Sequence, residues 1–81
     1  MKSIQLIQGT FNSEDAVNII TQMIHIKIRY HENKINNSSH EEDIKYRESK
    51  IKSLQKDLFE LRKEMSLKSD DVVMSAIINI Q

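Results

Sequence analysis

Glycine and proline, the residues that most often interrupt regular secondary structure, are almost absent from this chain. Its 81 residues include one glycine, Gly9, and no proline. Because proline breaks a helix interior and glycine weakens it, long uninterrupted helices are permitted almost everywhere after residue 10. Long helices are therefore the first expectation for this sequence.

The length of the chain predicts one small domain, residues 1–81, with a marginal core. A domain of this size buries only about 60% of the surface that its unfolded chain exposes. Small domains usually add disulfides, a metal, oligomerisation or very regular helix packing. The chain has no cysteine, which excludes disulfides and fits a reducing compartment.

The charge balance and the apolar pattern bear on partners and location. Twelve basic and twelve acidic side chains cancel to a formal net charge of zero, which argues against a dedicated nucleic-acid binder. No segment approaches the roughly 20 apolar residues that span a bilayer. The first residues also lack the long apolar run of a signal peptide. We expect a cytoplasmic protein with no membrane partner.

The N-terminal part predicts a strand and then a helix. Residues 2–8 alternate, with Ile4 and Leu6 on one side, and Gly9 follows directly. Ile7 departs slightly from this alternation. Asn12 or Ser13 is a suitable N-cap for a helix over residues 13–35.

The predicted helix 13–35 carries an unusually wide apolar arc. At about 100° per residue its apolar side chains cover roughly 200°, about twice an ordinary buried stripe. The arc comprises Ala16, Val17, Ile19, Ile20, Met23, Ile24, Ile26, Ile28, Tyr30 and Ile35. Such a helix is expected to contact more than one neighbour.

A second helix is predicted over residues 40–68, after the polar loop 36–39. Ser39 and Glu42 match a capping box at its start. Its heptad positions carry Ile44, Ile51, Leu54, Leu58, Leu61 and Met65, with Arg47 and Lys68 as the departures. The short loop requires an antiparallel hairpin, in which the second helix, at roughly 40 Å against 33 Å, projects beyond the first.

The C-terminal segment allows two interpretations. Alternation of apolar residues over 72–80, rich in Val and Ile, favours a strand. Ser69, Asp70 and Asp71 could instead cap a short third helix. The predicted fold class is therefore α+β, mostly α, with the order β-α-α-β and the two strands antiparallel. The alternative is an all-α chain.

No group of residues has the pattern of a catalytic or metal site. His25, His31 and His40 lack ligand spacing, and one glycine cannot make a phosphate-binding loop. Lys27, His31 and Glu48 are expected to lie close together across the hairpin, either as a site of perturbed pKa or as a structural cluster. The structural interpretation is favoured because a two-helix hairpin has no concave pocket.

A basic stripe is predicted along the second helix. It consists of Lys45, Lys52, Lys56 and Lys63. Such a stripe can follow a phosphate backbone or pair with acidic residues of a partner, although it is more often a solvated flank.

Several short motifs resemble small uncharacterised proteins of Bacteroidetes-type bacteria. They are Gly9-Thr10-Phe11 with Glu14 and Ala16, and then Lys27-Ile28 with His31. The resemblance covers most of the chain and implies no activity.

The sequence thus predicts a non-enzymatic interaction or scaffold module without a cofactor. We expect it to form a homodimer that buries Ile19, Ile26 and Tyr30, since a two-stranded ribbon also leaves two unpaired edges. The alternative is a small accessory regulator that contacts nucleic acid or a larger protein through its second helix.

Overall fold

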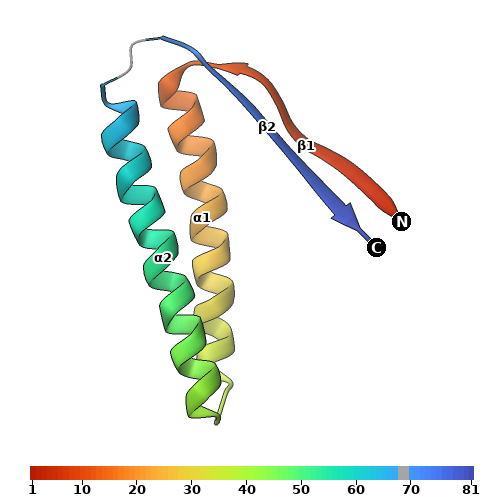
Figure 1. Ribbon diagram of the computed structural model, residues 1–81, viewed down its shortest axis with the longest axis vertical. Helices are drawn as coiled ribbons and strands as arrows, with labels where there is room; N and C mark the ends of the chain where they lie inside the picture. The colour runs from red at the N-terminus through yellow and green to blue at the C-terminus, as the bar shows by residue number, and fades with distance from the viewer. Residues whose placement is uncertain (68–69) are drawn as a thin grey trace.

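The chain folds into a helical hairpin with a two-stranded ribbon at its open end (Figure 1). The computed structural model describes residues 1–67 and 70–81. Strand β1 (Lys2–Phe11) leads into helix α1 (Ser13–Asn36), helix α2 (Glu41–Met65) and strand β2 (Val72–Ile80). The predicted β-α-α-β order is confirmed, and residues 72–80 form a strand rather than a third helix.

The start of α1 follows the predicted capping chemistry. Asn12 is the N-cap, and its Oδ1 accepts a hydrogen bond of 2.8 Å from the backbone N–H of Asp15. Glu14 and Asp15 occupy the first turn, where the helix dipole favours negative charge. This local chemistry fixes the point at which the ribbon ends and the helix begins.

The start of α2 differs from the prediction. The helix begins at Glu41, its N-cap is His40, and no side chain caps it, so the capping box of Ser39 and Glu42 is wrong. The physical reason lies in the loop, where Ser38 Oγ accepts from the backbone N–H of His40 at 3.2 Å. The Ser38 N–H in turn donates to the Ile35 carbonyl at 3.1 Å.

The two helices are almost equal in length. They contain 24 and 25 residues. The prediction that α2 is longer than α1 and projects beyond it is therefore wrong. Helix α2 ends at Met65. The Ser66 N–H still bonds to the Arg62 carbonyl four residues back, whereas the Leu67 N–H bonds to the Glu64 carbonyl three residues back, a tighter 3₁₀-type turn. Lys68, the other predicted departure from the heptad pattern, lies outside the described residues.

The helices pack along two rows with heptad spacing. The α2 row has the predicted residues, each at least half-buried: Ile44, Arg47, Ile51, Leu54, Leu58, Leu61 and Met65. The facing α1 row, spaced 4-3-4-3-4, is half-buried throughout: Val17, Thr21, Ile24, Ile28, His31 and Ile35. Together the rows form the contact between the two antiparallel helices, with the spacing that a helix-packing seam requires.

One polar atom in this contact has no partner. Thr21 Oγ1 is buried without a hydrogen bond, and an unsatisfied buried hydroxyl costs about 1–3 kcal/mol. We expect Thr21→Val, which keeps the shape and removes the hydroxyl, to raise Tm by about 4–8 °C per kcal/mol gained. Thr10→Val, at the exposed Thr10 of β1, is the matched control. A Tm that falls in Thr21→Val would show that the hydroxyl is satisfied.

The ribbon pairs the two ends of the chain in antiparallel register, from Phe11 opposite Val72 to Lys2 opposite Ile80. The prediction that the strand ends at residue 8, just before Gly9, is wrong, because β1 runs to Phe11. Gly9 has φ of +143°, a conformation that L residues rarely adopt, so β1 bends there and continues to Phe11.

A β-bulge at Leu6 explains the irregular alternation of β1. Ile4 lies opposite Ile78 and Ile7 lies opposite Ala76, so one residue of β1 is inserted between them. Paired residues share a face, and the bulge therefore places Ile4 and Ile7 on the same face. The sequence had indicated Ile4 and Leu6 instead.

Candidate functional site

The molecule has far more surface than a compact chain of its mass. Its accessible area is 6572 Å², whereas about 5,000 Å² is expected for a folded monomer of 9.5 kDa. Its radius of gyration is 15.4 Å, against about 12 Å for a compact domain of this length. The extents are 46 × 35 × 13 Å, so the shortest dimension is close to the thickness of one helix.

Burial inside the chain is correspondingly small. Among the described residues, only Ala16, at 0% exposure, and Leu58, at 7%, are buried hydrophobics. The candidate interface on α1 is open, with Ile26 at 62% and Tyr30 at 53% exposure. Ile19 is half-buried. These three residues lie on the side of α1 that α2 does not cover.

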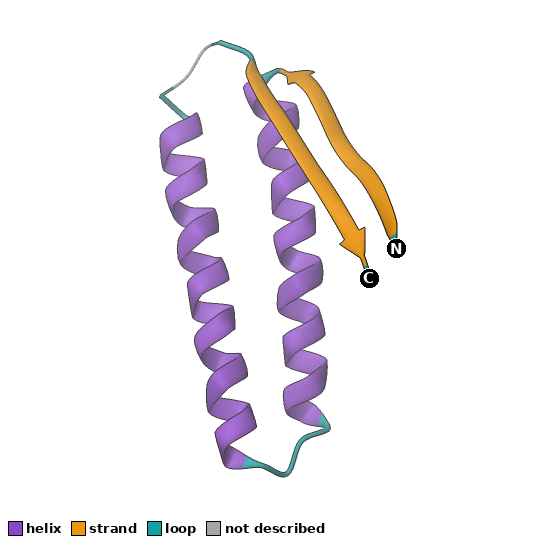
Figure 2. Ribbon diagram, turned by 45° about the vertical axis from the view of Figure 1, so that its right-hand side comes forward, coloured by secondary structure: helices purple, strands orange, loops and turns teal. Residues whose placement is uncertain are grey.

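The ribbon adds a second apolar surface. Its inner face carries Ile4, Ile7 and Phe11 from β1, with Val72, Met74, Ala76, Ile78 and Ile80 from β2. Near the helices these residues are half-buried, whereas Ile4, Ile78 and Ile80 at the far end are exposed. Figure 2 shows why, since the ribbon diverges from α1 toward the two chain termini.

An open groove lies in the angle between the ribbon and the hairpin. Its volume is about 600 Å³. Ile20, Met23 and Lys27 of α1 line it together with Ile7 and Met74 of the ribbon. Its apolar lining suits another protein segment better than a polar substrate.

The polar cluster near the hairpin tip is centred on Arg47. Its Nη1 donates to His31 Nδ1 at 3.1 Å, and its Nε donates to Asp43 Oδ2 at 3.4 Å. The guanidinium carbon also lies 5.6 Å from the centroid of the Tyr30 ring, which is cation–π distance. Because arginine only donates, His31 Nδ1 acts here as an acceptor.

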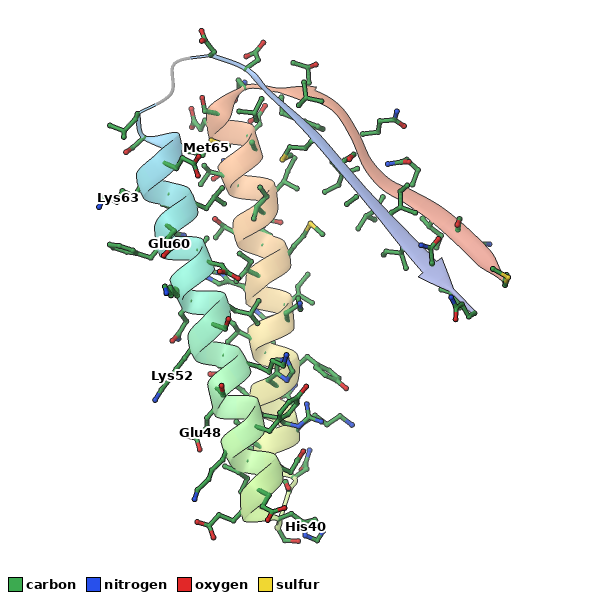
Figure 3. All side chains as sticks on the ribbon, viewed as in Figure 1. His40, Glu48, Lys52, Glu60, Lys63 and Met65 are labelled. Atoms are coloured by element: carbon green, nitrogen blue, oxygen red, sulfur yellow. The ribbon has the colours of Figure 1, made fainter. Side chains whose placement is uncertain are left out.

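This cluster differs from the one predicted. Lys27 is exposed and lines the groove, while Glu48 projects from the outer surface of α2 (Figure 3). The sequence marks Arg47 as a departure from the heptad pattern, predicts its i,i+4 pair with Asp43 and places it near His31 across the hairpin. The structure confirms the pair with Asp43. The bond between Arg47 and His31 links α2 to α1.

The predicted basic stripe is exposed but mixed with acids. Lys45 pairs with Glu41 at 3.5 Å, and Lys52 and Lys63 project on the same outer side as Glu48 and Glu60 (Figure 3). Lys56 is likewise exposed. Phe59, beside the stripe, is 68% exposed. Charges of both signs give this face no single-sign field.

The described residues, 1–67 and 70–81, also bear on metal binding and on membrane insertion. No group of three or more His, Cys, Asp or Glu side chains is placed to hold a metal ion. In the same part of the chain, no helix has the length and apolar character to cross a membrane.

Comparisons with protein-family models, curated proteins and solved structures give no significant match to this chain.

Proposed function

We propose that the protein is a non-enzymatic interaction module whose working form is a homodimer. The observation that carries the proposal is the excess surface, about 1,500 Å² above the area expected for its mass. A standard protein interface buries about 800 Å² on each partner. One interface of ordinary size therefore removes much of this excess.

The composition of the exposed surface supports the same function. Monomeric proteins rarely expose large contiguous apolar patches, and here Ile26 and Tyr30 of α1 are exposed together with Ile4, Ile78 and Ile80 of the ribbon. The hydrogen-bonding groups of the hairpin tip, in contrast, are engaged with one another. The exposed apolar surface supports binding rather than chemistry.

The test is the mass of the protein in solution. Light scattering after size exclusion at micromolar concentration is expected to give about 19 kDa, twice the 9.5 kDa of one chain. A mass of one chain across the concentration range contradicts the proposal. The same measurement with an added oligonucleotide tests the alternative role of α2, for which a salt-dependent complex is expected.

A further inference from the structure

A second heptad row runs along α1 on the side remote from α2. Ile19, Met23, Ile26 and Tyr30 are spaced 4-3-4, the spacing that forms a helix-packing seam. At about 100° per residue, this row is turned roughly 160° away from the row that contacts α2. We call it the outer row; it has no covering helix in the described chain.

The outer row lies beside the ribbon, although the groove under the ribbon also reaches α2, where Leu54 and Asp57 line it. Figures 1 and 2 both show the ribbon on the side of α1 that is remote from α2. Met23 belongs to the outer row and also lines the groove with Ile7 and Ala76 of the ribbon. A wedge between α1 and the diverging ribbon opens toward the chain termini in both figures, and Ile26 of the outer row and Ile78 of the ribbon are both exposed.

The outer row is complementary to itself in the antiparallel direction. Its 4-3-4 spacing reads the same from either end, so Ile19 would meet Tyr30 of a second copy and Met23 would meet Ile26. The ends of α1 are also complementary in charge, with Glu14 and Asp15 in the first turn and Lys34 in the last. An antiparallel pair brings these opposite charges, and opposite helix dipoles, near each other.

We propose that the second copy docks along the outer row, with the two α1 helices antiparallel about a two-fold axis. Each α1 enters the wedge of the other copy, and the far ribbon face of Ile4, Ile78 and Ile80 covers it. This proposal rests on the proposed homodimer and specifies its surface.

The absence of cysteine from the sequence permits a direct test by disulfide trapping. Ile19→Cys and Tyr30→Cys are made as separate variants, mixed, allowed to exchange subunits and oxidised. A disulfide needs Cα atoms within about 7 Å. Antiparallel pairing brings residue 19 to residue 30 of the other copy, but separates two copies of residue 19 by about 16 Å along the axis.

The expected result is cross-linking in the mixture and none in either variant alone. Cross-linking of each variant with itself would overturn the antiparallel arrangement. A dimeric mass without cross-links would overturn the outer row as the surface and leave the homodimer standing, whereas a monomeric mass would overturn both. If either variant fails to fold, the mass of Ile26→Lys tests the outer row instead, with a monomer expected; a dimer of unchanged affinity would overturn this surface.

Discussion

Leu58→Asp is expected to abolish cooperative unfolding of the protein. Leu58 is the most buried side chain of α2, at 7% exposure, and lies in the contact between the helices. Truncating a buried leucine alone costs about 2–5 kcal/mol, and an unpaired carboxylate adds a desolvation penalty. A domain of this size has a total stability of about 4–12 kcal/mol. Far-UV circular dichroism should therefore show loss of helix and no sharp melting transition.

The neighbouring residue provides a matched control. Phe59→Asp adds the same charge one position along, at a side chain that is 68% exposed. Surface substitutions usually change stability by no more than about 0.5 kcal/mol, so this variant should melt close to the wild type at equal protein concentration. Similar melting of Leu58→Asp and the wild type would contradict the helical hairpin as the core.

Ile26→Lys is expected to convert the homodimer into a monomer. Two-fold symmetry places the change in both copies of one interface. Losing the burial of two isoleucines costs about 3–6 kcal/mol, and each 1.4 kcal/mol is tenfold in affinity. The dissociation constant should therefore rise by at least about 100-fold, which sedimentation or light scattering across a concentration series measures.

His25→Lys is the control for this variant. It adds an amine one residue earlier on α1, at an exposed position that is turned about 100° from Ile26 and lies outside the apolar arc. Its mass should remain that of the wild type. If Ile26→Lys stays dimeric at the same concentrations, this face of α1 is not part of the dimer interface.

The hairpin was predictable because its periodicity is local and strong. The α2 row from Ile44 to Met65 is half-buried or buried as predicted, and Asn12 caps α1 as its side chain allows. The capping box was mispredicted because the sequence does not give the backbone conformation of the loop that contains Ser39. There, Ser38 rather than Ser39 accepts a hydrogen bond from the backbone.

The site was less predictable, since it depends on how elements distant in sequence meet. Placing Ile4 and Ile7 on one face requires the register with Ala76 and Ile78, which the alternation of β1 alone does not contain. Predicting the hydrogen bond between Arg47 and His31 requires knowing how each helix is rotated about its own axis. The exposure of Ile26 and Tyr30 could be predicted from the sequence, because the apolar arc of α1 is wider than the narrow seam of α2 can cover.

The pairing of the first strand with the last has a consequence for the order of folding. The hairpin joins neighbouring segments and can form early, whereas Lys2 finds its partner only at Ile80, and such long-range pairing is slow. On the ribosome, β1 emerges before β2 and cannot pair with it until residues 72–80 are synthesised. During that interval the apolar face of β1 lacks its partner strand, so the ribbon is expected to close last and to open first.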